Sequence, residues 1–336
     1  MSQLNKQVTI NRRFARSARI DKDLHAADSL TGYVLQAGVA HALTAMAHSQ
    51  IETHQGAFTW TGPYGGGKSS AALLVASLIN GHAKARKQAR QIVGKDLQTL
   101  YDKAFPGQAG AWAVIAVTGS RIALRDAITD AAAATLKWNR STCTQARQGD
   151  EALLANLMHS ATKEHGGIVL IMDEPGKMLE HEAASGGDIH LLQDLAECCA
   201  RSEGRLVVIG VLHQAFEQYA ARISRDGRQE WAKVQGRFQD IPFLAGADES
   251  VTLLGQAIKC AHRPPAADRQ ATQVAAAVAR RKTTDEAVLA QALARTWPLN
   301  PLTALLLGPV SRQRFAQNER SVFGFLSSAE PGGFQE

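Results

Sequence analysis

The sequence predicts an α/β protein in which a parallel sheet of five strands is followed by a smaller helical domain. Two observations carry this prediction. From residue 57 to residue 244, short apolar runs alternate with longer helical stretches, and strands joined by helices form right-handed crossovers in a parallel sheet covered on both faces. After residue 245 the apolar runs stop, and the remaining segments have helical periodicity.

Each element follows from the local pattern along the chain. Short, mostly apolar runs predict strands at 57–61, 112–117, 168–172, 205–211 and 241–244. The stretches between them predict helices at 68–80, 84–103, 122–136, 151–163, 189–201 and from the fourth strand to residue 219. The helical domain is expected to contain helices at 250–260, 271–281 and 284–296, with a helical segment at 301–326. We therefore divide the chain into a basic, solvated arm (1–30), an α/β core (31–247), a helical lid domain (248–326) and a loop tail (327–336).

Composition excludes several classes of protein. The chain has 336 residues, 45% hydrophobic and 20% charged, which is the balance of a globular rather than a disordered protein. Its four cysteines include no CxxC pair, so a disulfide framework is not expected and a reducing cytoplasm is the natural compartment. No apolar run approaches the roughly 18–20 residues that a membrane helix needs. The formal charge of +6 permits contact with nucleic acid without demonstrating it.

A phosphate-binding loop is the most specific motif. The pattern G-x-x-x-x-G-K-[ST] is matched by Gly62, Pro63, Tyr64, Gly65, Gly66, Gly67, Lys68 and Ser69. Glycines let successive backbone N–H groups converge on phosphate oxygens at the positive end of the following helix. Lys68 is expected to reach the β- and γ-phosphates, and the Ser69 hydroxyl to ligate Mg²⁺. Ser70 follows in the first helical turn, next to the nucleotide, and needs no catalytic role.

A second site follows the apolar strand at 168–172, which ends in Asp173 and Glu174. Two carboxylates at the end of a buried strand are costly unless something uses them. We expect Asp173 to hold the Mg²⁺ shell, directly or through water, and Glu174 to polarise the attacking water as general base. The strand at 112–117 lies between the two motifs in sequence, which is typical of ATPases with an added central strand. No (N/T)KxD motif is present, so ATP is favoured over GTP.

Further polar residues are candidates for sensing the nucleotide. His213 and Gln214 follow the fourth strand, where ligands of parallel sheets collect, so His213 is expected to sense the γ-phosphate; a helix-capping Gln214 beside a half-buried His213 is the alternative. Arg237 precedes the fifth strand and is a candidate arginine finger for a neighbouring subunit, or else a solvated arginine. In the helical domain, candidates for a lid arginine are Arg312, Arg314 and Arg320.

The order of these motifs resembles the AAA+ ATPases, and within them the branch with the origin-recognition/Cdc6 and STAND proteins, across about residues 30–326. Three segments narrow the resemblance: 58–70; 231–238; and 301–307 with 317–320. They are similar to the N-terminal ATPase portions of large bacterial anti-phage proteins, such as those of BREX-like systems. The resemblance implies ATP and Mg²⁺ at Lys68, Ser69, Asp173 and Glu174, and self-assembly that lets an arginine act in trans. It also implies an effector or sensor region beyond this chain.

The resulting hypothesis is an ATP-hydrolysing motor or switch of a bacterial, cytoplasmic anti-phage complex, with copies of itself and other defence proteins as partners and no membrane attachment. Two alternatives remain open. A nucleotide-gated scaffold with little turnover would keep the same phosphate and acidic motifs. An origin-type loader would bind DNA, for which the only support is a helix with five basic residues between 84 and 95; a solvated helix face is the simpler explanation of that charge.

Overall fold

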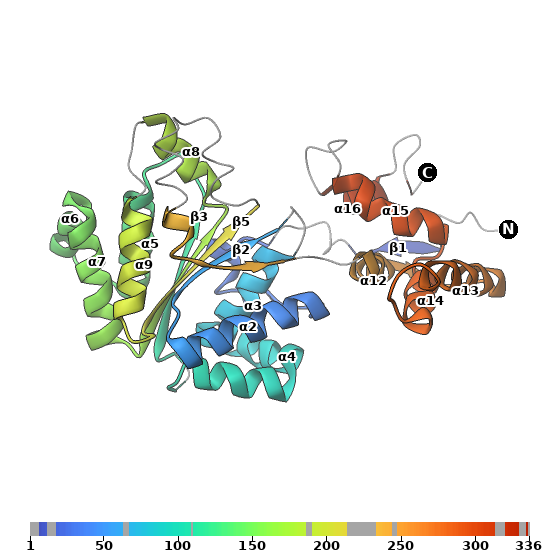
Figure 1. The fold of residues 1–336 in the computed structure, drawn as a ribbon, viewed down its shortest axis with the longest axis horizontal. Coiled ribbons are helices and arrows are strands. Elements are labelled where there is room, and N and C mark those ends of the chain that lie inside the picture. Colours follow the sequence, from blue (N-terminus) through green and yellow to red (C-terminus); the bar gives the residue numbers. More distant parts are fainter. Residues whose placement is uncertain are drawn as a thin grey trace. The chain divides into compact units, whose positions relative to one another are not determined.

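In the computed structural model the chain forms two compact units (Figure 1). It describes residues 7–11, 18–62, 67–108, 110–185, 190–213, 233–243, 247–312, 320–328 and 334. The larger unit spans 18–243 and contains the sheet. The smaller unit combines residues 1–17 with 244–336. No helix in the described ranges has the length and apolar character needed to cross a membrane.

The larger unit is built on a five-stranded parallel sheet, which confirms the predicted fold class. Its strands are β2 (Ala57–Thr61), β3 (Trp112–Thr118), β4 (Gly167–Asp173), β5 (Leu206–Leu212) and β6 (Gln239–Pro242). They lie in the order β3-β4-β5-β2-β6, and each neighbouring pair is parallel. The predicted strand bounds differ from these by at most two residues, and the largest shift is at β6, which was predicted at 241–244.

The added central strand of this sheet is β5. The strand that lies between the two motifs in sequence, β3, forms an edge of the sheet instead. Because β5 separates β2 from β4, Thr61 pairs with Leu212 and Asp173 with Val211. The carboxyl ends of β2, β5 and β4 therefore lie next to one another. The residues that follow these three strands lie together along this side of the sheet, which we call its carboxyl edge.

Helices cover both faces of the sheet (Figure 1). One face carries α2 (Ala37–Thr53), α3 (Lys68–Asn80) and α4 (Ala83–Ala104); the other carries α5 (Leu124–Leu136), α6 (Arg140–Gln148), α7 (Asp150–His159) and α9 (His190–Arg201), with the π-helix at Ser160–Glu164 after α7 and α8 (Gly176–Ser185) after β4. Strand β4 shows why the sheet has two cores. Val169 and Ile171 pack into one cluster, whereas Ile168 and Leu170 pack into the other, as the two-residue period of a strand requires.

The smaller unit contains a helical core and one short two-stranded sheet. Its helices are α12 (Ala247–Ala257), α13 (Pro265–Ala279), α14 (Glu286–Arg295), α15 (Pro301–Arg312) and α16 (Arg320–Ser327). The helix expected to continue to Cys260 ends at Ala257 and is followed by β7 (Ile258–Cys260), which pairs antiparallel with β1 (Val8–Ile10). Strands therefore do not stop at residue 245, because the N-terminal segment supplies a partner.

The stretch 1–30, expected as one basic arm, is divided between the two units. Strand β1 belongs to the smaller unit, whereas the short helix α1 (Ile20–Asp23) belongs to the larger one. Ile20, Leu24 and Leu30 are at most 3% exposed and join the cluster under α2, α3 and α4. These apolar residues are too widely spaced for a recognisable helical stripe, and burying them fixes the segment against the sheet unit.

Candidate functional site

The phosphate-binding motif lies between β2 and α3. Gly62 has φ 154° and Gly67 has φ 76°, values that L side chains rarely adopt. A Cβ on Gly62 would also lie 2.4 Å from the carbonyl oxygen of Phe243, so both space and conformation require glycine there. Pro63, Tyr64, Gly65 and Gly66 lie outside the described residues. No described side chain caps the N-terminus of α3, which leaves its first N–H groups to bind another acceptor.

The first residues of α3 bring Lys68 and Ser69 to the carboxyl edge of the sheet. Lys68 is 4% exposed, and its Nζ donates to the carbonyl oxygen of Gly62 at 2.6 Å. The Ser69 hydroxyl donates to Oδ1 of Asp173 at 2.9 Å. Ser70 is half-buried in the same turn. The residues that the two motifs predict as phosphate and Mg²⁺ ligands thus meet across a long separation in sequence.

Asp173 is the last residue of β4 and is only 4% exposed. Burial raises the pKa of its carboxyl to about 6, with Glu174 adding to the effect, while the Ser69 hydrogen bond and the Lys68 charge oppose it. A buried carboxylate of this kind favours a proton or a bound cation. Asp173, a buried carboxylate at the end of β4, is therefore a candidate ligand for a metal ion.

Glu174 follows in the left-handed conformation, with φ 54°. Its Oε2 lies 2.9 Å from Nζ of Lys177 and its Oε1 lies 3.6 Å from Nε2 of His213. Contacts with His213 and then with Lys177 lower the pKa of Glu174 to about 2, against the opposing effect of burial. The side chain is therefore ionised at neutral pH and already engaged by two partners.

A close approach of backbones sets this turn. The N–H of Gly119, just after β3, donates to the carbonyl oxygen of Asp173 at 2.7 Å. A Cβ on Gly119 would lie 1.8 Å from the carbonyl oxygen of Glu174. Only glycine fits here, so the loop after β3 supports the turn that carries both carboxylates.

His213 follows β5, the strand that lies between β2 and β4. Its side chain is 16% exposed. Burial lowers the pKa of His213, as does the nearby Lys68 charge, although the contact with Glu174 opposes this. The imidazole is therefore neutral at neutral pH. Gln214, the alternative polar residue after this strand, lies outside the described residues.

Three residues near the site were not identified from the sequence. Asp21, in α1, lies close enough to Asp173 to raise the pKa of that carboxyl. Nη2 of Arg19 donates to Oδ2 of Asp21 at 2.6 Å. Lys177 follows Glu174 by one helical turn, and this spacing in sequence was the one available signal. Asp21 and Arg19 belong to no motif, and folding alone brings them to this edge.

The donor set fits a magnesium ion and a nucleotide phosphate. Mg²⁺ takes oxygen ligands at about 2.0–2.1 Å in an octahedron, so two adjacent ligands lie about 2.9 Å apart. The observed separation between the Ser69 and Asp173 oxygens is 2.9 Å. The buried Lys68 and the uncapped N-terminus of α3 supply the positive groups that phosphate oxygens need. Asp21 adds a third carboxylate nearby.

Arg237 lies away from this cluster. It precedes β6, which runs parallel to β2, so it lies at the amino edge of the sheet, opposite Lys68 and Asp173. Its Nη1 contacts Oε1 of Glu197 at 2.8 Å, and its side chain is 41% exposed. Phe238 packs into the core as expected. Any action of Arg237 on a nucleotide would have to be on the site of another copy.

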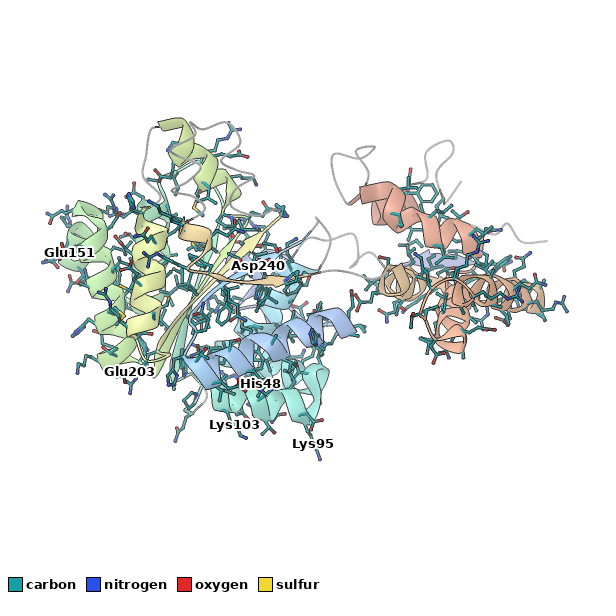
Figure 2. The ribbon with its side chains drawn as sticks, in the orientation of Figure 1. His48, Lys95, Lys103, Glu151, Glu203 and Asp240 are labelled. Atoms are coloured by element: carbon teal, nitrogen blue, oxygen red, sulfur yellow. The ribbon has the colours of Figure 1, made fainter. Side chains whose placement is uncertain are left out.

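The lid arginines remain candidates. Arg312 ends α15 and Arg320 begins α16, but their side chains, like the whole of Arg314, lie outside what the structure describes. Asp240, labelled in Figure 2, lies on the edge strand β6. Its carboxylate accepts hydrogen bonds from Thr59 at 2.8 Å and from Thr61 at 2.9 Å. These bonds tie β6 to the strand that leads into the phosphate-binding loop.

Comparisons with solved structures give partial likeness of fold. The chain is similar to the ORC2 protein of Aeropyrum pernix in its ADPNP–ADP complexes, at 16% identity and a TM-score of 0.43, over 78% of this chain and 69% of that one. The ADP form of that protein is 15% identical to this chain, with a TM-score of 0.45, over 90% of this chain and 76% of that one. PCH-2 of C. elegans is 10% identical, with a TM-score of 0.33, over 68% of this chain and 49% of that one. No protein-family profile and no curated protein sequence matches the chain.

Proposed function

We propose that the chain is an ATP-binding, Mg²⁺-dependent ATPase of the AAA+ class. The observation that carries the proposal is the hydrogen bond from Ser69 to Asp173, formed beside the buried Lys68. The sequence predicts all three as nucleotide or metal ligands from two separate motifs, and the fold brings them together at the carboxyl edge of the sheet. Ligands of parallel α/β sheets bind at this edge.

The chain's own residues have distinct roles in this proposal. Lys68 and the N-terminus of α3 bind and orient the phosphates, while Ser69 and Asp173 hold the metal. Mg²⁺, when bound, supplies positive charge that stabilises the developing charge on phosphate oxygens. Glu174 is ionised and accepts a proton from the attacking water, and the neutral His213 beside it orients that water.

Glu174 is held back as a base by its partners. A carboxylate with a pKa of about 2 is a weak proton acceptor. If the Lys177 side chain moves away, the pKa of Glu174 rises and the carboxylate becomes a better base. This contact favours, as a second candidate, a nucleotide-gated scaffold that turns over slowly until a partner or neighbouring subunit displaces Lys177.

ATP hydrolysis per protomer, measured against protein concentration, tests the proposal. Lys68→Ala should abolish tight ATP binding, whereas Glu174→Gln should keep binding and stop turnover. Lys163→Ala is the matched control, because Lys163 is exposed on the π-helix and should leave both unchanged. Unchanged ATP binding in Lys68→Ala would overturn the site assignment, and equal rates in Glu174→Gln and wild type would overturn the role of the base.

The same titration separates the candidate functions. A rate per protomer that climbs with concentration supports sites completed between subunits, with Arg237 acting in trans. Intact ATP binding with almost no turnover supports the scaffold, in which case oligomer size should differ between ATP and ADP. An absence of ATP binding would contradict both the ATPase and the nucleotide-gated scaffold.

We also propose, on the sequence resemblance alone, that the module serves a bacterial cytoplasmic anti-phage complex as a homo-oligomer with other defence proteins. Phage plating on cells that carry the complete system tests this role. Glu174→Gln in that system should restore plaque formation to the level of cells without it. Undiminished protection by the variant would contradict a defence role for ATP hydrolysis.

A further inference from the structure

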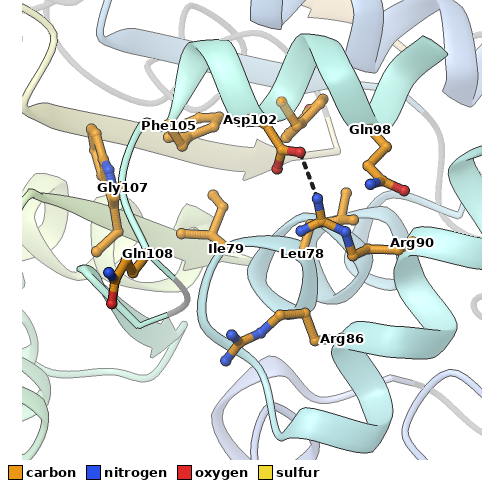
Figure 3. A pocket seen from close by; sticks show the side chains of 11 residues that line it. Leu78, Ile79, Arg86, Arg90, Gln98, Asp102, Phe105, Gly107 and Gln108 are labelled. Carbon is orange, nitrogen blue, oxygen red and sulfur yellow. Dashed lines mark hydrogen bonds and ion pairs between the residues drawn. The ribbon is translucent and has the colours of Figure 1, made fainter. Parts of the chain in front are cut away.

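Helix α4 is bent into two arms on the far side of the sheet unit from the α7 face (Figure 1). Gly94 has φ 72° and ψ 175°, which interrupts the helix between residues 83–93 and 95–104. Arg90 on the first arm contacts Asp102 on the second at 2.5 Å (Figure 3). The amide oxygen of Gln98, in its hydrogen-bonding orientation, accepts from Arg90 at 2.9 and 3.1 Å. These contacts tie the arms together at a defined angle.

An open groove of about 600 Å³ lies along the bend. Its lining includes four cationic residues, and none of its lining residues is acidic: the cations are Arg86, Lys87, Arg90 and Lys95. The amides of Gln91 and Gln98 complete its polar surface. Arg90 is neutralised by Asp102, so the remaining three cations give the groove its charge. A groove with this net positive charge attracts anions.

A smaller cavity of about 60 Å³ shares Arg86, Arg90 and Gln98 with the groove, and Asp102 also lines it. Figure 3 shows the Arg86 guanidinium beside this cavity, whose walls include Ile79 and Phe105. One guanidinium nitrogen, Nη2, donates to the carbonyl oxygen of Gly81 at 3.0 Å. Its Nε is buried and has no hydrogen-bond partner. A buried donor without an acceptor is costly, and an anion oxygen at this position would satisfy it.

Lys87 and Lys95 extend the positive charge outward from Arg86. Both are exposed, and one stands on each arm of the bend. Within the part of the chain that the structure describes, neither ammonium group has a carboxylate within 4.0 Å. A ligand that crosses the groove would therefore meet a lysine on each arm, and Arg86 also lines the groove.

We propose that the bent helix α4 binds the phosphate backbone of a nucleic acid. The groove is open and its cations are spread over both arms, which suits a chain of regularly spaced phosphates rather than a single anion. Arginine and lysine bind phosphate oxygens without distinguishing bases, so recognition is independent of sequence. This surface lies apart from Lys68 and Asp173, and the inference goes beyond ATP hydrolysis.

Fluorescence anisotropy of the full chain with a labelled DNA duplex and the corresponding single strand tests the inference, without nucleotide, between about 50 and 200 mM NaCl. The Lys87→Gln/Lys95→Gln double variant and Arg86→Gln are compared with wild type. The matched control, Lys163→Gln/Lys282→Gln, removes two exposed charges elsewhere. Circular dichroism establishes that each variant is folded, and ATP hydrolysis should equal that of wild type.

Wild type should bind DNA with an affinity that falls steeply as salt rises. The Lys87→Gln/Lys95→Gln variant should lose two phosphate contacts. The slope of log K against log [salt] should therefore become shallower by about 1.8 for duplex DNA or about 1.4 for the single strand, and binding at low salt should weaken at least about tenfold. The control should keep the wild-type slope. Absence of salt-dependent binding by wild type, or equal losses in the control and groove variants, would overturn the proposal, whatever the ATPase result.

Discussion

Replacing Asp173 with asparagine should stabilise the ligand-free protein at neutral pH. The folded-state pKa of about 6 lies above the ordinary 3.8, chiefly because the carboxyl is buried. The stability that the protonated form contributes is complete below about pH 4 and is lost as the pH rises through 6. At neutral pH the ionised form thus costs roughly 3 kcal/mol. Asparagine cannot ionise, yet its Oδ1 can still accept the Ser69 hydrogen bond.

Thermal unfolding by circular dichroism, in a chelator and over about pH 4.5 to 7.5, measures this effect. A gain approaching 3 kcal/mol corresponds to a rise of roughly 6–12 °C in the unfolding midpoint at the upper pH. The gain should fall to roughly 1 kcal/mol at the lower pH, because the protonated wild type has recovered most of its stability there. Mg²⁺ should then stabilise wild type and not the variant. The control Asp96→Asn, on the exposed surface of α4, should change neither midpoint.

An Asp173→Asn variant no more stable than wild type at neutral pH would refute a destabilising charge at this position. An equal gain at both ends of the pH range would also refute it, because the effect would then not arise from ionisation. Loss of ATP hydrolysis in the same variant is expected and provides a separate measurement. A more stable and inactive protein would indicate that the site holds a carboxylate at the expense of stability.

Three further predictions concern one residue at the site and two at the amino ends of the strands. Gly119→Ala should lower unfolding free energy by roughly 1–3 kcal/mol in chemical denaturation and reduce ATP hydrolysis, because its Cβ would meet the Glu174 carbonyl; wild-type values for both would contradict this. Ser202→Ala should cost roughly 1–3 kcal/mol while ATP binding persists, because the hydroxyl accepts from a buried N–H at 2.9 Å; an unchanged denaturation midpoint would refute it. Arg237→Ala should change the free energy of unfolding by less than about 1 kcal/mol, because its ion pair with Glu197 is exposed. At high protein concentration the variant should hydrolyse ATP about 10³-fold more slowly than wild type, and an unchanged ATPase rate would exclude Arg237 as an arginine finger.

Much of the fold was predictable because its signals are local. Strand β4 is wholly buried and flanked by helices, and a run of apolar residues of that length indicates a central parallel strand. The phosphate-binding motif likewise requires Gly67 and Lys68 next to each other at the start of a helix. In both cases the residues that determine the structure are neighbours in the chain.

The bend of α4 shows where local patterns were insufficient. The sequence predicts one basic helix over 84–103, and Gly94 is tolerated inside many helices. Its effect depends on Leu97 and Tyr101, which pack into the same core as Ala89 and Val93. Both arms reach that core only when the chain turns at the glycine, so packing rather than propensity decides the bend and the groove that it forms.

The sequence by itself determined the five strands and the positions of the G-x-x-x-x-G-K-[ST] motif and of the paired carboxylates, since each depends on residue types at short, fixed spacing. Only the tertiary structure decided that β5 separates β2 from β4, that β1 pairs with β7, and that Asp21 lies close to Asp173. Such contacts join segments far apart in the chain. They are selected by the burial of whole apolar faces, a property that is distributed over many residues and has no motif.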